Sequence, residues 1–359
     1  MMGGVSLRQR IALELQRQLT LNCAREHPLR EIFWECTLRC CLECRHCGSD
    51  CKVTSGLKDM PFTDFEMVLR RINEAYGPED KMVILSGGEP LMRRDLEDCI
   101  RRIREMGFSC GMVTNGYLLT RERAAGLLRA GLGSATVSID GTEADHDWMR
   151  GVSGSFTRAL NAAMILSGSG IVFDVVTCVN RRNLAHLEEL KEILISSGIK
   201  AWRLFTIFPA GRAAEDPQLQ LTSQEFRSLM NFIVRTRNEG RIRTSYACEG
   251  FLGEYEGKVR DNLYMCQAGL TVASVLADGS ISACASIRSD YHQGNIYKDD
   301  FVDVWENRFR PYRDRRWMKK DDCATCKWFR YCQGNGMHLR VTPKAIFSSV
   351  TSRNYRQRG

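Results

Sequence analysis

Residues 30–208 alternate short apolar runs with longer amphipathic segments, and this alternation limits the possible folds more than any other feature. Runs rich in β-branched and aromatic residues predict six strands: 30–35, 82–86, 110–114, 134–139, 173–179 and 202–208. The intervals show helical spacing of apolar residues. Strands that alternate with helices form parallel βαβ units. The sequence therefore predicts an α/β fold with its chemistry at the carboxyl ends of the strands.

The alternation also predicts how the chain is divided. Residues 1–28 have the pattern of one amphipathic helix, and 29–212 form the alternating core. Residues 213–247 read as a helical linker, because Thr222 opens a capping box in LTSQEF; a second capping box pairs Thr63 with Glu66. From 248 to 359, short glycine-punctuated segments with cysteines replace the alternation, which predicts a separate domain.

Composition narrows the class of protein. The chain has 359 residues, 16 cysteines and a formal net charge of +8. We find no secretory signal pattern and no apolar run long enough to span a bilayer, so we expect a cytoplasmic protein. In a reducing cytosol, cysteines are metal ligands or buried thiols more often than disulfides. The charge is modest and the basic cluster 308–320 contains Asp314, which predicts a solvated surface and no nucleic-acid partner.

The loop after the first predicted strand contains a cysteine motif, C-x3-C-x2-C. Its members are Cys40, Cys44 and Cys47. Three thiolates can hold three irons of a cubane cluster and leave the fourth iron open to a small molecule. Zinc is the alternative, because it takes four ligands and Cys36 or Cys51 could complete the set. The spacing alone leaves both interpretations open.

Further polar motifs follow the next strands. SGGEP follows the second strand, TNG the third and SIDG the fourth. Asn115-Gly116 is also a common turn pair, and Ser138 or Asp140 could cap the next helix. Because the carboxyl ends of parallel strands share one edge of a sheet, we expect these residues to lie near the cysteine loop.

In this order, the motifs of residues 29–212 resemble the radical SAM superfamily. The resemblance implies a partial (β/α)6 barrel of the TIM type, with a 4Fe–4S cluster on Cys40, Cys44 and Cys47 whose open iron binds S-adenosylmethionine. It also implies a set of residues around that cofactor: Gly87, Gly88, Glu89, Asn115, Ser138, Asp140 and Arg150. Glu89 would accept from the ammonium, the glycines would let the backbone approach the methionine moiety, and Arg150 would pair with the carboxylate.

His46 stands where the family usually has an aromatic residue near adenine. Its flat imidazole suits that place, and a solvent-facing histidine is the alternative. The motifs identify no catalytic acid or base.

The C-terminal cysteines carry a second resemblance. Cys266 is followed by Gly279 and Cys284, and Cys323-x2-Cys326-x5-Cys332 comes later. This spacing resembles the SPASM domain, which carries auxiliary iron–sulfur clusters; a zinc ribbon is the alternative for the second group. Gly336 stands where the pattern has a further cysteine, and the tail has none. With Cys248, the six thiols allow two sets of three or a single complete cluster.

The resemblance implies an enzyme that cleaves S-adenosylmethionine to a deoxyadenosyl radical and modifies a peptide or protein by hydrogen abstraction. One alternative is a nucleotide-like small molecule, as in molybdenum-cofactor cyclases. The other is an electron-transfer or scaffold protein without turnover. The reaction needs a one-electron reductant such as flavodoxin or ferredoxin, and any leader-peptide recognition would need another protein or another surface.

Overall fold

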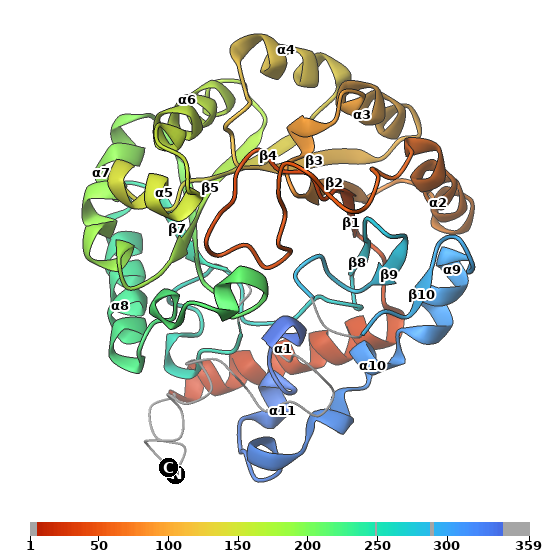
Figure 1. The fold of residues 1–359 in the computed structure, drawn as a ribbon. Coiled ribbons are helices and arrows are strands. Elements are labelled where there is room, and N and C mark those ends of the chain that lie inside the picture. The colour runs from red at the N-terminus through yellow and green to blue at the C-terminus, as the bar shows by residue number, and fades with distance from the viewer. Residues whose placement is uncertain (1–5, 248–249, 288–290, 340–359) are drawn as a thin grey trace.

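A single sheet runs through the whole molecule. The structure is a computed structural model, and it describes residues 6–247, 250–287 and 291–339. Within these residues the strand order is β10-β9-β8-β1-β2-β3-β4-β5-β6-β7. The edges β7 and β10 do not pair with each other, so the barrel is open (Figure 1). This confirms the predicted α/β class and the partial barrel.

The central strands β1 to β7 all run parallel to their neighbours. They are β1 (Glu31–Thr37), β2 (Met82–Gly87), β3 (Ser109–Thr114), β4 (Ser134–Ser138), β5 (Val172–Val179), β6 (Ala201–Thr206) and β7 (Arg243–Tyr246). Six of them match the predicted strands. The seventh, β7, lies within the segment that we expected to be a helical linker, and its pairing with β6 makes that segment part of the barrel.

Helices cover the outside of this sheet (Figure 1). They are α2 (Phe62–Tyr76), α3 (Leu96–Glu105), α4 (Arg121–Ala130), α5 (Glu143–Arg150), α6 (Ser155–Ser167), α7 (Leu187–Ser196) and α8 (Ser223–Glu239). The capping box at Thr222 is confirmed, because its hydroxyl accepts from the N–H of Glu225 and Glu225 accepts in return. The box expected at Thr63 is wrong: α2 begins one residue earlier, after Pro61, and has no side-chain cap.

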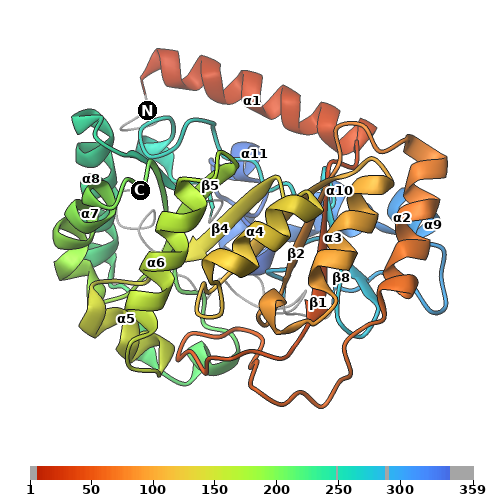
Figure 2. The ribbon, with the colours of Figure 1, turned by 90° about the horizontal axis from the view of Figure 1, so that it is seen from above.

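Helix α1 (Leu7–Glu26) lies across the amino end of the strands, on the side of the barrel opposite the cysteine loop (Figure 2). Leu13 is its buried apolar residue, whereas Ile11, Leu15 and Leu19 are exposed. None of the helices in the described part of the chain combines the length and the apolarity needed to cross a membrane.

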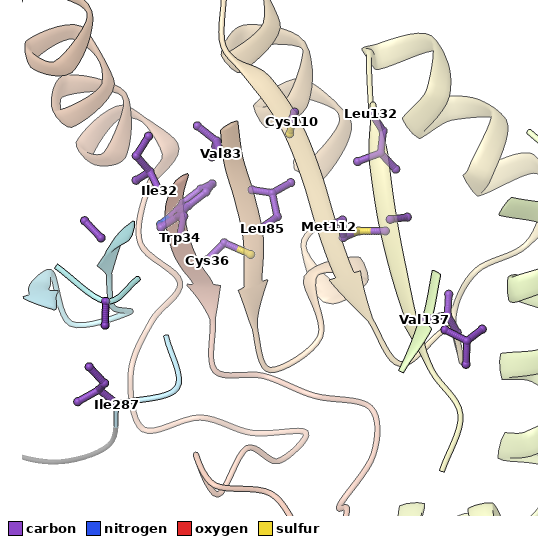
Figure 3. Close-up of a cluster of buried hydrophobic side chains, with 14 of the residues drawn as sticks. Ile32, Trp34, Cys36, Val83, Leu85, Cys110, Met112, Leu132, Val137 and Ile287 are labelled. Atoms are coloured by element: carbon purple, nitrogen blue, oxygen red, sulfur yellow. The ribbon is translucent and has the colours of Figure 1, made fainter. Parts of the chain in front are cut away.

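The main core lies between the strands and the outer helices. Ile32, Trp34, Val83 and Leu85 are completely buried on the face of β1 and β2 that meets α2 and α3 (Figure 3). Trp34 stacks on Phe65 of α2, with 4.5 Å between ring centroids. Because this face is dry and close-packed, the strand ends that carry the cysteine loop have a rigid base.

The C-terminal region joins the same sheet. Its strands are β8 (Val272–Val275), β9 (Ser280–Ser282) and β10 (Gly294–Asn295). Strand β8 runs parallel to β1 on the side away from β2, and the Ala277 N–H donates to Glu35 at 3.1 Å. The helical turns that follow include α9 (Phe301–Asp303), α10 (Arg310–Arg313) and α11 (Phe329–Cys332). The cysteine-rich region is therefore attached to the first strand of the barrel.

Candidate active site

The cysteine motif lies on a loop that leaves the carboxyl end of β1. Cys40 and Cys44 are buried and Cys47 is partly buried. The Cys40 N–H donates to the carbonyl of Lys52 at 2.8 Å, which closes the loop on itself. No three thiols of the described residues lie within 4.8 Å of one another. A tetrahedral zinc site needs sulfur atoms about 3.8 Å apart, a spacing that no three of these thiols have.

Arg212 fastens this loop to the end of β6. Its Nε donates to the carbonyl of Cys44 at 2.8 Å, and its Nη1 lies 2.6 Å from Asp50. Its own N–H donates to the carbonyl of Cys47 at 3.0 Å. Gly211 has φ +54, and a Cβ there would stand 2.5 Å from the same carbonyl. Arg212 was not among the residues expected at the site, although it ends the segment FPAGR that follows the sixth strand.

The thiols of the loop differ in acidity. A hydrogen bond from the Cys51 thiol, together with Arg212, lowers the pKa of Cys47 to about 5 despite burial. Burial raises the pKa of Cys44, and Arg150 opposes this. Cys47 is thus prepared as a thiolate before any metal binds, which is the form that ligates iron.

The two glycines of SGGEP let the end of β2 lie against the end of β1. A Cβ on Gly87 would stand 2.2 Å from the carbonyl oxygen of Thr37, and one on Gly88 would stand 2.2 Å from that of Arg39. The Gly88 N–H donates to Thr37 at 2.7 Å. The glycines therefore make room for the backbone that leads into the cysteine loop.

Glu89 is completely buried and accepts three hydrogen bonds from the protein. It accepts from the Thr114 hydroxyl at 2.6 Å, from the Asn115 N–H at 2.8 Å and from the Leu91 N–H at 3.2 Å. Burial raises its pKa, and these hydrogen bonds oppose the shift. An ionised carboxylate has about four acceptor positions. At most one therefore remains for an ammonium donor, and the main contact of Glu89 is with the end of β3.

Asn115 connects the end of β3 to the cysteine loop. Its side-chain oxygen accepts from the Tyr117 N–H at 2.9 Å, which forms the local turn that the sequence left open. Its amide nitrogen then lies 3.6 Å from the sulfur of Cys40 and 3.6 Å from that of Cys41. Asn115 therefore forms the turn after β3 and also contacts both thiols.

Asp140 and Arg150 form a buried ion pair beside the loop, with 2.6 Å between Oδ2 and Nη2. Arg150 also donates to the sulfur of Cys44 at 3.5 Å. The second oxygen of Asp140 accepts from the Cys178 N–H at 2.8 Å. Although burial alone would raise it, the pKa of Asp140 is lowered, mainly by Arg150. Ser138 is the last residue of β4.

His46 belongs to the cysteine loop and faces this ion pair. Its Nε2 is 3.7 Å from Asp140, and its buried Nδ1 has no hydrogen-bond partner in the described structure. Burial lowers the pKa of His46 to about 4, so the ring is neutral. His46, Asp140 and Cys178 lie close enough to share a metal ion, but the guanidinium of Arg150 at the same carboxylate disfavours a cation.

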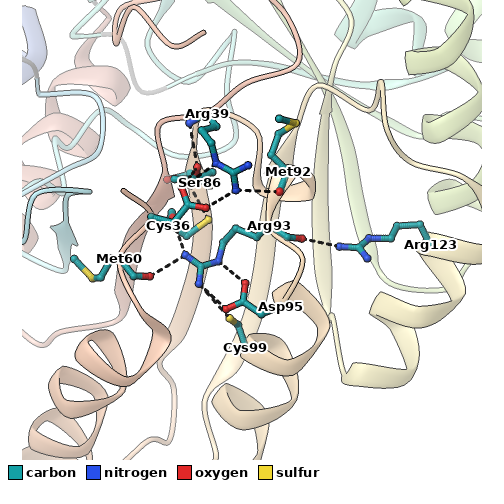
Figure 4. A network of polar contacts seen from close by, with 11 residues as sticks. Cys36, Arg39, Met60, Ser86, Met92, Arg93, Asp95, Cys99 and Arg123 are labelled. Carbon is teal, nitrogen blue, oxygen red and sulfur yellow. Dashed lines mark hydrogen bonds and ion pairs between the residues drawn. The ribbon is translucent and has the colours of Figure 1, made fainter. Parts of the chain in front are cut away.

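The buried Arg93 supports these strand ends from below (Figure 4). Its Nη1 donates to the carbonyls of Cys36 at 2.8 Å and Met60 at 2.9 Å, and its other nitrogens bind Asp95. The guanidinium also lies 4.9 Å from the ring centre of Trp34. Arg93 therefore ties β1, the loop before α2 and the start of α3 together.

Three C-terminal cysteines form one group. Cys323, Cys326 and Cys332 lie in the turns around α11, where the Cys326 N–H donates to the Cys323 carbonyl at 3.3 Å. Burial, and then the neighbouring thiols of Cys326 and Cys323, raises the pKa of Cys332 to about 12. The contribution of the two neighbouring thiols shows that the three cysteines lie near one another.

Cys266 has a different environment. Burial raises the pKa of its thiol, but Arg315 and the N–H groups of Met337 and Ala268 outweigh burial, so the pKa falls below its usual value. Arg315 is itself buried, which corrects the expectation that all of 308–320 is solvated. Cys284 accepts from the Ser286 N–H at 3.5 Å. Cys248 lies outside the described residues.

Two family models match the chain. The radical SAM superfamily model covers residues 34–194, and the model of the iron–sulfur cluster-binding SPASM domain covers 266–327. The chain belongs to the radical SAM superfamily. The cofactors of such a protein are a 4Fe–4S cluster, auxiliary iron–sulfur clusters and S-adenosylmethionine.

Several named proteins are similar over most of their length. The AdoMet-dependent heme synthase of Oleidesulfovibrio alaskensis is 27% identical over 344 residues, covering 89% of this chain and 87% of that protein. The mycofactocin maturase MftC of Mycolicibacterium smegmatis is 29% identical over 313 residues, covering 85% and 77%. The structure of Streptococcus suis SuiB bound to S-adenosylmethionine covers 93% of this chain and 80% of its own, with a TM-score of 0.70 and 17% identity, and it shares the fold.

The residues present fit these cofactors. Three thiols stand on a pinned loop, and several buried polar atoms beside them have no hydrogen-bond partner among the described residues, including His46 Nδ1, Arg150 Nε and Arg212 Nη2. Buried polar atoms in native proteins are nearly always paired, so this group of atoms is consistent with a polar ligand beside the loop.

Proposed function

We propose that Cys40, Cys44 and Cys47 bind the 4Fe–4S cluster of a radical SAM reaction, and that the residues around them hold S-adenosylmethionine. The chemistry that this cofactor pair supplies is reductive cleavage of the sulfonium and abstraction of a hydrogen atom from the substrate. The observation that carries the proposal is the pinned three-thiol loop with unpaired His46 Nδ1 and Arg150 Nε beside it.

The chain's own residues would orient the cofactor and keep the site rigid. Arg150 links the thiol of Cys44 to Asp140, and Arg212 holds the loop carbonyls. His46 offers a neutral flat ring and a free nitrogen to a purine. Such preorganisation places the reacting atoms without further movement of the protein.

The substrate that we propose first is a peptide or protein. The similarity to the mycofactocin maturase supports this, since 29% identity extends over both the barrel and the cysteine-rich region. A flavodoxin or ferredoxin is the proposed one-electron donor.

A tetrapyrrole is the second candidate. The heme synthase of Oleidesulfovibrio alaskensis aligns over more of this chain than the maturase does, at nearly the same identity. Identity of this level does not separate the two substrate classes, so an experiment must.

The cofactor assignment is tested by two triple variants, reconstituted without oxygen. Replacing Cys40, Cys44 and Cys47 by Ala should remove about four irons per chain and abolish formation of deoxyadenosine from S-adenosylmethionine. Replacing Cys323, Cys326 and Cys332 by Ala should lower the iron content but leave that cleavage largely intact. Zinc in place of iron, or no cleavage by the reduced wild type, would contradict the proposal.

The substrate class is tested with the wild type, dithionite and either Fe-coproporphyrin III or candidate precursor peptides encoded by neighbouring genes. A peptide substrate should raise deoxyadenosine formation above the substrate-free rate and change the mass of the peptide. If only the porphyrin does this, the second candidate replaces the first.

A further inference from the structure

His338 occupies the space beside Gly336. A Cβ on Gly336 would stand 2.9 Å from Cε1 and 3.1 Å from Nδ1 of the His338 ring. The imidazole therefore lies in van der Waals contact with the place that a side chain at position 336 would enter.

The thiol of Cys266 lies beside the same turn. Its sulfur accepts from the N–H of Met337, the residue between Gly336 and His338, and from the N–H of Ala268. Arg315 donates to both the sulfur and the carbonyl of Cys266. These contacts place the sulfur of Cys266 against the residue that directly precedes His338.

The imidazole of His338 has no protein partner that would explain its position. In the described part of the chain no hydrogen bond or ion pair to its ring is recorded, and its contact is edge-to-face with Phe208, 5.9 Å between centroids. Phe208 follows β6, and its carbonyl accepts from Ala210, two residues before Arg212. The ring is partly buried and lies between the cysteine-rich region and the mouth of the barrel.

We propose that His338 is a ligand of the auxiliary iron–sulfur cluster that Cys266 binds. Histidine replaces cysteine on iron in known clusters and raises their reduction potential, because a neutral ligand takes the place of an anion. The buried cation of Arg315 would also raise the reduction potential of this cluster. Cys323, Cys326 and Cys332 form a separate group of thiols, to which we assign a second auxiliary cluster.

The test uses the full-length chain with Cys40, Cys44 and Cys47 replaced by Ala, so that only auxiliary clusters remain. The protein is labelled with ¹⁵N-histidine, reconstituted with iron and sulfide, reduced with dithionite and studied by pulsed EPR. A histidine nitrogen coupling is expected in this parent. It should disappear in His338→Ala and in Cys266→Ala, and persist in the control His292→Ala, whose side chain is exposed.

Two further variants separate ligation from folding. His338→Cys should keep the iron content, lose the nitrogen coupling and shift the midpoint potential to a lower value. Cys323→Ala should leave the coupling in place, because it belongs to the other group. Absence of the coupling in the parent, its survival in His338→Ala, or its loss in Cys323→Ala would overturn the assignment. None of these readouts depends on a substrate, so failure here is distinguishable from failure of the proposed function.

Discussion

Glu89, Asp140 and Arg150 are ionisable side chains buried among the strand ends, and each is held by other parts of the protein. Glu89 accepts three hydrogen bonds, and Arg150 lies between Asp140 and the sulfur of Cys44. Uncompensated charges at this depth would destabilise the fold. Because these charges have partners, the three side chains are stable at this depth and hold fixed positions around the cysteine loop.

His146 makes this region sensitive to acid. Its Nδ1 accepts from the Asp140 N–H at 3.0 Å, and burial lowers its pKa to about 4. Between about pH 6.5 and pH 4 the unfolded chain binds a proton that the folded chain does not, so stability falls as pH falls. From about pH 7 to pH 5.5 we expect the wild type to lose about 1 kcal/mol more than His146→Gln, measured by urea unfolding without oxygen. An equal loss in both proteins would contradict this.

At the scale of elements, the close approach of β1 and β2 determines where the cysteine loop begins. The Gly88 N–H donates to the carbonyl of Thr37, the last residue of β1, and the Glu89 N–H donates to the carbonyl of Arg39 just beyond it. This continuation of the pairing between β1 and β2 requires glycine at positions 87 and 88. Backbone oxygens of Thr37 and Arg39 lie where a Cβ would be.

Gly88→Ala should therefore displace the loop. Because the clash is with a backbone oxygen, no rotamer change relieves it, and we expect loss of about four irons per chain and of S-adenosylmethionine binding. Iron assay and equilibrium dialysis check this. Gly168→Ala is the control, because the atom nearest to a Cβ at that position is 3.6 Å away. This variant should keep its iron content and its binding of S-adenosylmethionine.

Arg93→Met removes the cation that joins three elements. The carbonyls of Cys36 and Met60 would lose their donor, and we expect the free energy of unfolding to fall by about 3 kcal/mol. The neighbouring Arg94 is exposed, so Arg94→Met should change the free energy of unfolding by less than about 0.5 kcal/mol. Similar values for the two variants in denaturant titrations would refute this role of Arg93.

At the scale of the whole molecule, one sheet connects the barrel with the cysteine-rich region. Strand β8 pairs with β1 over Glu31–Trp34, and both strands are part of the same core. A shared strand pairing and a shared core make separate unfolding of the two regions costly.

Hydrogen exchange should show this coupling. We expect the amides of β1 and β8 in the reconstituted protein to open with the same free energy and the same denaturant dependence, measured by mass spectrometry. The edge strand β10 should open at lower cost, since it pairs on one side only. Independent opening of β8 at low denaturant would show that the two regions are separate folding units.

Sequence patterns specified the local parts of this protein. The six strands, the capping box at Thr222 and the cysteine spacings could be read directly, because periodicity and short motifs depend on residues close in the chain. The same signals misplaced the start of α2, where Pro61 and burial of the first turn override a capping pattern. The motif order also indicated the superfamily.

Tertiary structure alone decided the contacts between distant residues. Arg212 meets Cys44 across 168 positions and Arg150 meets it across 106, and no local pattern encodes such a pair. The same holds for β8 beside β1, for Arg315 beneath Cys266 and for His338 in the space beside Gly336. Burial and charge pairing select these contacts only after the sheet has assembled, because neither partner is buried or paired in the isolated segment.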